Sequence, residues 1–284
     1  MQVSDVVRAR RAAVEVAAGL GLTVADASVV HNSNKLAVRL LPCDILARVA
    51  FAGFEVFESE VEIGRRLAEV GAPVASLDPR VAPRAYERDG FKVTLWTYYE
   101  QEDEEVSPAD YATALERLHV DMAPIDVHVP HFSSRIDEAR RLVESPKLTP
   151  RLESSDRKLL GTTLRSQSRA IDERSSAEQL LHGEPHPGNL LSTKSGPLFI
   201  DLETCCRGPV EFDLAHVPEE VGKRYTGADQ ELLRVFRLLV LAMVAAWRWD
   251  RDDQFPDGRR AGRELLDVIR GGPPWPTLDI VSRP

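Results

Sequence analysis

Strand patterns and helix patterns occupy different parts of this 284-residue chain. The segments KLAVRLL and DILARVA, with Pro-Cys-Asp at the turn, predict a β-hairpin, and FKVTLWTYY predicts a further strand. From Ser107 onward the apolar residues mostly follow a helical spacing. The chain is also longer than most single-core domains. We therefore predict an α+β protein with a small sheet-containing lobe at 1–98 and a larger, mostly helical lobe at 99–284.

Several helices can be placed from their end signals. A first helix is predicted to begin at an N-cap on Ser4 and to end near Gly19. The segment SPAD predicts a capping box of Ser107 and Asp110, with Pro108 in the first turn. The segment FESEVEIGRRLAEVGAPV predicts a helix that stops at Gly71. The apolar residues expected to face the core from that helix are Val61, Ile63, Leu67 and Val70.

Composition narrows the possible partners and compartment. The net charge of −9 argues against a nucleic-acid backbone as the main partner. The apolar run LLVLAMVAAW is too short to span a bilayer, so it predicts a buried helix and gives no reason to expect a membrane partner. Three cysteines, two of them adjacent, make a poor disulfide framework, and we expect a cytoplasmic protein. Nothing in the composition specifies an oligomeric state.

The most unusual chemistry lies in LLHGEPHPGNLL at 180–191. A zinc peptidase helix is a poor interpretation, because Glu184 does not directly follow His182 and two prolines and a glycine break the helix. A zinc deaminase is rejected, because Cys205 and Cys206 lack the required Pro-Cys-x-x-Cys spacing. An isolated His-Gly pair would ordinarily indicate only a loop.

The order of the polar residues in this segment instead favours phosphoryl transfer. Asn189 follows Glu184 by five residues, and Asp201 follows an apolar strand further on. Kinase catalytic loops carry an acid near the acceptor hydroxyl, then an asparagine and an aspartate that hold Mg²⁺. Mg²⁺ prefers a few hard oxygen ligands, so Asn189 and Asp201 suit that role.

The sequence here resembles the aminoglycoside phosphotransferase and choline-kinase-like family. The resemblance rests on HGEPHPGNLL, LFIDLET and GPVEFDLAH, and VVHNSNKLAVRL, ILARVA and ESEVEIGRRLAEVGAPV match in order over the first lobe. It implies a bilobal protein-kinase-like fold and transfer of the γ-phosphoryl group of ATP or GTP to a small-molecule hydroxyl, with Mg²⁺. The chain is thus expected to be a small-molecule kinase.

The resemblance implies roles for single residues. Glu184 falls on the catalytic base, and Asn189 and Asp201 fall on the metal ligands. Arg48 falls where kinases use the strand lysine that contacts the α- and β-phosphates, and Glu60 falls on its helix partner, with Glu58 and Glu62 as close competitors. Arginine keeps the charge and can bind phosphate with two donors.

Further expectations concern supporting residues. The loop with Ser33 and Asn34 is expected to cover the phosphates, and the hinge with Thr97 and Tyr98 is expected to offer backbone groups to adenine. Trp96 and Tyr99 either line that pocket or belong to the core. His182 and His186 are expected to shape the catalytic loop, and Asp213 to accept its backbone N–H groups. Glu203 is expected either to contact the outer shell of the metal or the substrate, or to be exposed to solvent. His119 is expected to pack within its helix.

One departure and one open question remain. The family's usual base is aspartate, so Glu184 places its carboxylate about 1.5 Å further out. That change keeps open a non-catalytic, nucleotide-binding regulatory protein of the same fold. An aminoglycoside, another hydroxylated antibiotic, an amino sugar and a small metabolite all remain as acceptors. Acidic residues that either attract an amine or form solvated faces are Glu219, Glu220, Asp250, Asp252 and Asp253.

Overall fold

The computed structural model describes residues 1–32, 35–53, 57–174 and 177–278. Its contacts group into two compact units. The first unit comprises Met1–Val106, Ile125–His128 and Leu191–Glu203. The second comprises Ser107–Pro124, Val129–Leu190 and Thr204–Pro284. The lobe boundary expected between residues 98 and 99 stays a prediction.

The first unit is built on an antiparallel five-stranded sheet in the order β1-β2-β3-β5-β4. The strands are β1 (Val24–Asn32), β2 (Leu36–Pro42), β3 (Ile45–Phe51), β4 (Tyr86–Arg88) and β5 (Phe91–Thr97). The predicted hairpin is confirmed, since β2 pairs with β3 in a register that sets Ala37 opposite Arg48. The predicted strand is β5, which pairs with β3 and sets Thr94 opposite Arg48. Strand β1 was not predicted.

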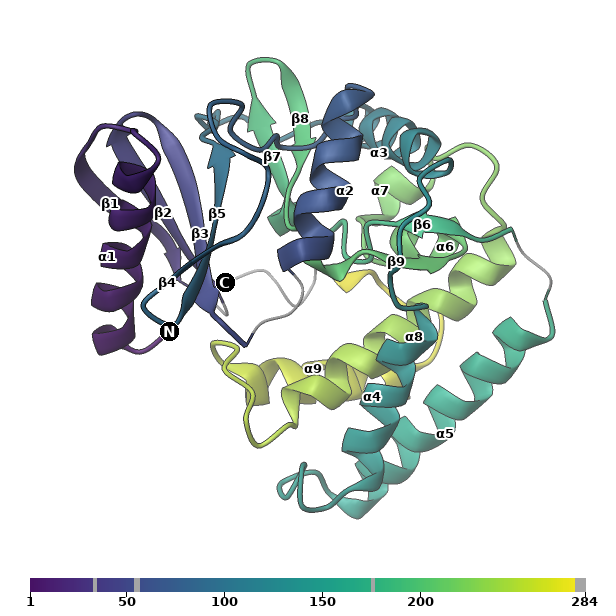
Figure 1. The fold of residues 1–284 in the computed structure, drawn as a ribbon. Helices are drawn as coiled ribbons and strands as arrows, with labels where there is room; N and C mark the ends of the chain where they lie inside the picture. Colours follow the sequence, from purple (N-terminus) through teal and green to yellow (C-terminus); the bar gives the residue numbers. More distant parts are fainter. Residues whose placement is uncertain (33–34, 54–56, 175–176, 279–284) are drawn as a thin grey trace. The chain divides into compact units, whose positions relative to one another are not determined.

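Helices cover both faces of this sheet. Helix α1 (Val3–Gly19) lies along one face (Figure 1) and packs small side chains such as Ala9, Ala13 and Ala17 against it. Helix α2 (Phe57–Glu69) packs against β5 on the other side, where Gly64 leaves room for the ring of Trp96. Residues 91–96 are therefore all buried, on both faces of the strand.

Two details of the helix predictions were wrong. Helix α1 begins at Val3, because the backbone is extended at Gln2, so Ser4 lies inside the first turn and is not its cap. In α2, Val61, Ile63 and Leu67 are buried as expected, but Val70 is 56% exposed because the helix has already ended at Glu69. Gly71 then adopts a φ of 70°, which suits glycine.

A later segment of the chain returns to the first unit. The hairpin of β7 (Leu190–Thr193) and β8 (Gly196–Phe199) precedes the short 3₁₀ helix η2 (Leu202–Thr204). Phe199 forms a parallel bridge with Val74, its N–H donates to Pro73 O at 2.8 Å, and its carbonyl accepts from Ala75 N at 2.9 Å. These bonds carry Asp201, two residues further on, into the first unit.

The second unit is mostly helical. Its long helices are α3 (Pro108–Met122), α4 (Ser133–Glu144), α5 (Ser154–Asp172), α8 (Gln230–Arg248) and α9 (Gly258–Gly271). Its shorter elements are β6 (Gln179–Leu181), η1 (Pro187–Asn189), β9 (Cys206–Gly208), α6 (Val210–Leu214) and α7 (Glu219–Gly222). The N-cap half of the predicted capping box is confirmed, since Ser107 Oγ accepts from Asp110 N at 3.2 Å, and Ser107 Oγ also donates to Asp110 Oδ2 at 2.6 Å.

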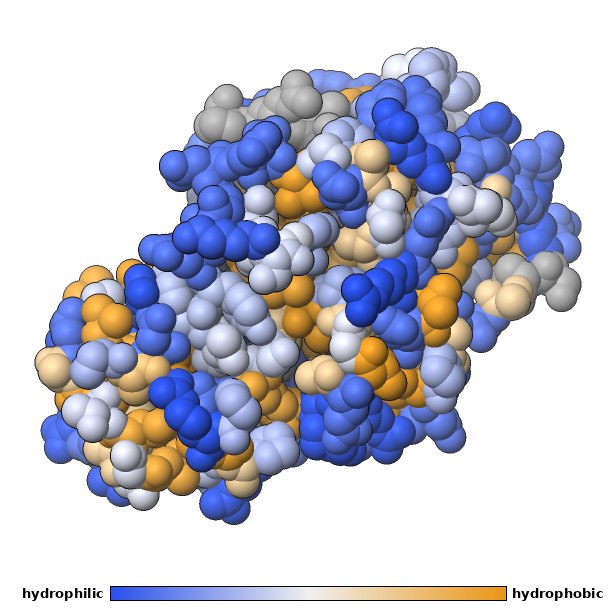
Figure 2. Space-filling model, turned by 90° about the horizontal axis from the view of Figure 1, so that it is seen from above, coloured by the Kyte–Doolittle hydropathy of each residue, from blue (hydrophilic) through white to orange (hydrophobic). Residues whose placement is uncertain are grey.

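The apolar run at 238–247 forms the centre of the second unit. It lies in α8, where nearly every residue of the run is buried, and α4, α5, α6 and α9 pack around it. Among the described residues, no helix has both the length and the apolar character needed to cross a membrane. On the face shown in Figure 2, hydrophilic residues predominate and apolar residues appear in small groups between them.

Candidate active site

The first unit holds a cluster of two basic and three acidic side chains, here called the charge cluster. Its members are Lys35, Arg48, Glu60, Asp201 and Glu203. Alternation along the strands explains the basic half, because Lys35 directly precedes β2 and shares the sheet face of Ala37 and its partner Arg48. Glu60 comes from the first turn of α2, while Asp201 and Glu203 follow β8.

Ion pairs connect all five members of the charge cluster. Arg48 donates from Nη1 to Glu60 Oε1 and from Nη2 to Asp201 Oδ1. Lys35 Nζ lies 3.0 Å from Glu60 Oε2 and 3.5 Å from Asp201 Oδ1, and it also pairs with Glu203. Of the three glutamates considered for α2, only Glu60 takes part. Glu58 pairs with Lys92, and Glu62 pairs with Arg65 and Arg66.

The charges of this cluster do not cancel. Three carboxylates face two cations, which leaves an excess of one negative charge. Burial disfavours the charged form of Arg48, but Glu60 and Asp201 outweigh it and hold its pKa above the ordinary arginine value. Burial and the neighbouring Asp201 raise the pKa of Glu203 despite the attraction of Lys35.

The donor chemistry of the cluster fits a hard divalent cation. Asp201 is 29% exposed and Glu203 is 18% exposed, whereas Glu60 is fully buried. Carboxylate oxygens are ligands that Mg²⁺ prefers, and Mg²⁺ usually takes only one or two from the protein. Within the described ranges, no group of three or more His, Cys, Asp or Glu residues is arranged to hold a metal by itself. The more exposed Asp201, with Glu203 beside it, could offer its carboxylate to such a cation.

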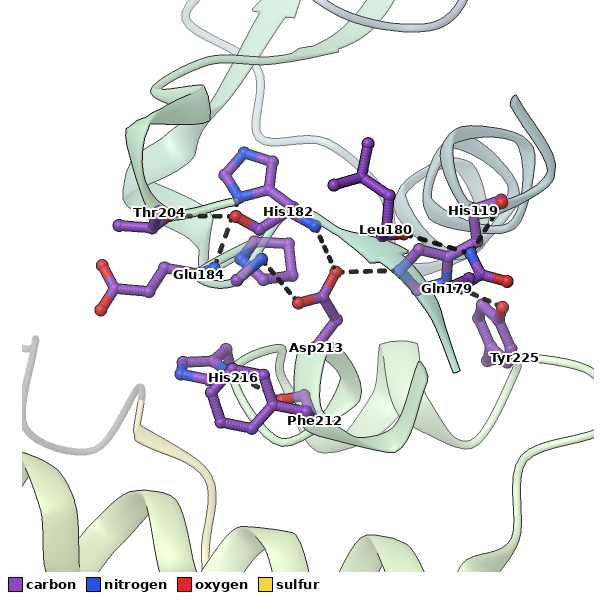
Figure 3. A network of polar contacts seen from close by, with 12 residues as sticks. His119, Gln179, Leu180, His182, Glu184, Thr204, Phe212, Asp213, His216 and Tyr225 are labelled. Atoms are coloured by element: carbon purple, nitrogen blue, oxygen red, sulfur yellow. Dashed lines mark hydrogen bonds and ion pairs between the residues drawn. The ribbon is translucent and has the colours of Figure 1, made fainter. Parts of the chain in front are cut away.

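The second unit holds the predicted catalytic loop, which connects β6 to β7. Asp213 fixes its start, because its carboxylate accepts from His182 N at 2.9 Å and from Gly183 N at 2.8 Å. His119 Nε2 lies 3.0 Å from the same carboxylate, and Thr204 Oγ1 donates to His182 O at 3.0 Å. Figure 3 shows Asp213 at the centre of this network and the carboxylate of Glu184 pointing away from it.

Glycine is required at the bend of this loop. Gly183 has a φ of 89°, and a Cβ there would lie 2.0 Å from the carbonyl oxygen of Thr204. The remainder of the loop is held by local bonds. His186 Nδ1 accepts from Gly188 N at 3.0 Å, and Asn189 Nδ2 donates to Glu184 O at 2.9 Å. Asn189 thus turns its amide nitrogen to the loop, and its carbonyl oxygen is the atom suited to a cation.

Asp213 stays ionised although it is fully buried. Burial alone would raise its pKa, but the hydrogen bond from His119 and the nearby histidines outweigh burial and lower it. His119, expected only to pack in its helix, therefore also supports Asp213. Its other ring nitrogen lies 2.8 Å from Tyr225 Oη.

Glu184 is held by an arginine that the sequence analysis did not find. Arg135, near the start of α4, donates from Nη2 to Glu184 Oε1 and from Nη1 to Gly183 O at 3.1 Å. Burial raises the pKa of Glu184, but the charge and hydrogen bond of Arg135, together with His216 and His186, outweigh burial and lower it. His216 lies close enough to interact with Glu184, and burial lowers the pKa of this histidine to about 4. Its ring is therefore neutral at pH 7.

Sequence comparison decides the family. The sequence model of the phosphotransferase enzyme family matches residues 32–253, which include the charge cluster and the catalytic loop. The chain belongs to this family. The resemblance seen in HGEPHPGN and LFIDLET is thereby confirmed, and the family's activity is phosphoryl transfer. No curated protein is similar enough in sequence to count as a match.

Solved structures extend the comparison to the fold. A structure of an amicoumacin kinase, hAmiN, in complex with AMP-PNP, Ca²⁺ and Ami covers 97% of this chain and 98% of its own, with a TM-score of 0.67 and 12% identity. A GDP complex of aminoglycoside 2′-phosphotransferase-IIIa covers 90% and 96%, with a TM-score of 0.68 and 16% identity. The choline kinase LicA from Streptococcus pneumoniae covers 91% and 98%, with a TM-score of 0.66 and 14% identity. At these identities the similarity establishes the fold, and it confirms the predicted kinase-like α+β class.

The residues predicted to form the hinge make contacts within the first unit. Thr97 N donates to Ser76 O at 2.9 Å, and Tyr99 Oη accepts from Ser76 N at 3.3 Å. The guanidinium of Arg39 lies 3.8 Å from the ring centre of Tyr98. Trp96 is buried and donates to Thr94 Oγ1, so it belongs to the core. The roles of Thr97 and Tyr98 in adenine binding stay predictions.

The remaining expected residues make other contacts or lie outside the described ranges. Ser33 and Asn34 fall outside the described residues. Glu219 and Glu220 pair with Lys223, and Asp250 accepts from Asp252 N at 3.1 Å. Asp253 lies 3.1 Å from Arg248. Cys43, Cys205 and Cys206 are free thiols.

Two functional candidates were missed by sequence reasoning. Lys35 could have been predicted, because the alternation in KLAVRLL places this lysine on the sheet face of Arg48. Arg135 could not have been predicted, because it lies 49 residues before Glu184 and no motif connects the two.

Proposed function

We propose that this protein transfers the γ-phosphoryl group of ATP or GTP to a hydroxyl group of a small molecule, with Mg²⁺ as cofactor. The observation that carries the proposal is the charge cluster, in which Arg48 bridges Glu60 and Asp201. Glu60 fixes the guanidinium of Arg48, which can then bind a phosphate group of the nucleotide. The partly exposed Asp201 lies next to Arg48 and can bind a metal ion beside that phosphate. Family membership supports the same reaction.

The first unit supplies nucleotide binding in this proposal. Arg48 and Lys35 donate to the α- and β-phosphates, and fully buried Glu60 holds both cations in place. Asp201 and Asn189 are the proposed ligands of Mg²⁺, and Glu203 is assigned to its outer shell. When bound, Mg²⁺ neutralises charge on the transferring phosphate.

The second unit supplies acceptor activation. Glu184 takes the proton of the acceptor hydroxyl as the hydroxyl oxygen forms a bond to the γ-phosphorus and the β–γ bridging P–O bond breaks. The leaving group is ADP or GDP. Asp213, His182 and His186 keep the loop in shape, since each hydrogen-bonds to its backbone.

A second candidate function is a nucleotide-binding regulatory protein without transfer activity. The observation that favours it is the pairing of Glu184 with Arg135, because a carboxylate held this way is a weak base. The two candidates share the nucleotide site and differ in turnover.

A thermal-shift panel of ATP and GTP, each with and without Mg²⁺, tests the nucleotide site. Ligands that bind only the folded state raise the melting temperature by mass action. We expect a shift that needs Mg²⁺, followed by ADP or GDP release with one member of an acceptor panel. A shift without turnover on any acceptor selects the regulatory function, and the absence of any shift contradicts both.

A further inference from the structure

The contact between Arg135 and Glu184 bears on which acceptor the protein uses. This inference rests on the proposed transfer to a hydroxyl group. The side chain of Glu184 is 25% exposed and that of Arg135 is 18% exposed, so a small molecule can reach the pair. As long as Arg135 holds Oε1, this oxygen is engaged and the charge of the carboxylate is neutralised.

Arg135 is held by more than Glu184. Its Nη1 donates to the carbonyl of Gly183 at 3.1 Å, and its guanidinium carbon lies 5.1 Å from the ring centre of Trp247 on α8. Stacking on an aromatic face and a hydrogen bond to a carbonyl leave the position of the guanidinium fixed when the carboxylate partner changes. The present partner is a carboxylate, and the planar fork of arginine matches that group.

Glu184 has two arginines nearby, Arg135 and Arg248. Arg248 also lies close enough for its charge to interact with Glu184, and its Nε is buried without a hydrogen-bond acceptor among the described residues. Asp253 already pairs with Arg248, and Glu219 and Glu220 pair with Lys223. A polycationic acceptor would therefore compete with Arg135 for Glu184 and leave a partly buried arginine without its carboxylate.

We propose that the acceptor is a short hydroxy acid, and that Arg135 binds its carboxylate and thereby leaves Glu184 to the hydroxyl group. One carboxylate replaces another on Arg135, so the arginine stays paired, and the released carboxylate of Glu184 accepts from the hydroxyl group of the acceptor. Because Arg135 and Glu184 are in direct contact, only a few bonds separate the carboxylate of the acceptor from its reacting hydroxyl. The proton of that hydroxyl passes to Glu184, and its oxygen takes the γ-phosphoryl group.

The test compares acceptors that differ only in charge. Glycerate, serine, 3-hydroxybutyrate and gluconate are each assayed beside their amides, with kanamycin as the cationic acceptor. The readouts are ADP or GDP release and binding to the protein saturated with a Mg²⁺–nucleotide analogue. An arginine–carboxylate contact is worth about 10- to 100-fold, so at least one acid should exceed its amide in kcat/KM by that factor.

Variants assign this preference to Arg135. Arg135→Gln should reduce the preference for the acid to near unity and leave the KM of the nucleotide unchanged. Arg135→Lys, which keeps the positive charge, should retain part of the preference for the acid. It replaces the glutamine variant in the assay if that variant does not fold. Arg141→Gln, an exposed arginine on the same helix, should behave as the parent. A merely structural arginine would lower kcat for acid and amide alike.

The outcomes separate this inference from the proposed function. Three results would overturn the hydroxy-acid acceptor and leave phosphoryl transfer standing. They are equal kcat/KM for acid and amide, a higher kcat/KM for kanamycin, and binding of none of the acids while the nucleotide still binds. Failure to bind any nucleotide would overturn the proposed function itself.

Discussion

The charge cluster of the first unit and the Asp213 network of the second are both buried and polar. They differ in the kind of group that they contain. The cluster crowds full charges, with three carboxylates against two cations. Around Asp213 a single carboxylate accepts from two backbone N–H groups and one histidine. The cluster has one carboxylate more than its cations can neutralise, and this excess negative charge can bind a cationic ligand. In the network, each donor has an acceptor. We infer that the cluster serves chemistry and the network serves the shape of the loop.

Asp201→Asn should give the largest effect on activity and little effect on stability. The substitution leaves two carboxylates against two cations, so the free energy of unfolding should hold or rise slightly. Transfer should fall on the order of 10³-fold, because the proposed metal loses its anionic ligand. Steady-state kinetics and urea unfolding measure the two quantities. Asp252→Asn, on an exposed carboxylate, is the matched control. If Asp201→Asn unfolds at a lower urea concentration than the parent but keeps its turnover, the cluster serves stability and not chemistry.

Glu184→Gln tests the chemical side of the catalytic loop. The amide keeps the length of the side chain but takes no proton, so kcat should fall by about 10²–10⁴-fold. Nucleotide affinity should not change, since Arg48 and Lys35 lie in the other unit. Glu184→Asp shows which length the loop is built for, because a rise in rate would mean that the natural protein is a weakened enzyme. Unchanged kcat in the glutamine variant, with chemistry as the slow step, would remove Glu184 from its role.

The fold was predictable where local patterns and tertiary structure agree. The β2–β3 hairpin, β5, α2 and the N-cap of Ser107 all have strong local signals, and all are present. Strand β1 has no such signal, because this edge strand is mostly exposed and lacks a clear apolar alternation. The return of residues 191–203 to the first unit depends on backbone bonds from Phe199 to Pro73 and Ala75. No sequence pattern encodes that pairing.

The candidate site shows the same division. Spacing identified the loop from His182 to Asn189 and the strand that precedes Asp201. The choice of Glu60 over Glu58 and Glu62 needed the structure, because only burial separates three glutamates two residues apart. Arg135 was out of reach of the sequence, since its relation to Glu184 is purely tertiary.

Asp213→Asn should do the reverse of Asp201→Asn. The amide has one acceptor oxygen in place of two, so a buried N–H of His182 or Gly183 loses its partner. An unpaired buried donor costs about 1–3 kcal/mol, and the hydrogen bond from His119 weakens as well. We expect the free energy of unfolding to fall by about 3 kcal/mol, measured by urea titration. Thr193→Ala, at a half-buried hydroxyl in the β7–β8 turn, should lose less. Full stability in the Asp213 variant would mean that the network does not hold the loop.

The smallest effect should be a pH dependence that comes from His216. Its ring is buried, Nδ1 lies 2.8 Å from Phe212 O, and Nε2 is buried without a hydrogen-bond partner among the described residues. The charged groups that act on it are Glu184 and Asp213, which favour its protonation, and Arg135, which opposes it. Burial outweighs the carboxylates and lowers the pKa to about 4 from an ordinary value of 6.5.

A lowered pKa fixes the sign of this dependence. Well above pH 6.5 the ring is neutral in both the folded and the unfolded state, and its contribution to stability is fully present. As the pH falls toward 4, the unfolded chain binds a proton that the folded protein excludes, so stability is lost. Linkage gives a loss of about 2 kcal/mol at pH 5 relative to pH 7.5 from this group alone. His216→Gln, which keeps a donor for Phe212 O, should show a pH dependence smaller by that amount, while His128→Gln, on an exposed histidine, should match the parent. Parallel pH profiles for parent and His216→Gln would show that another group titrates in its place.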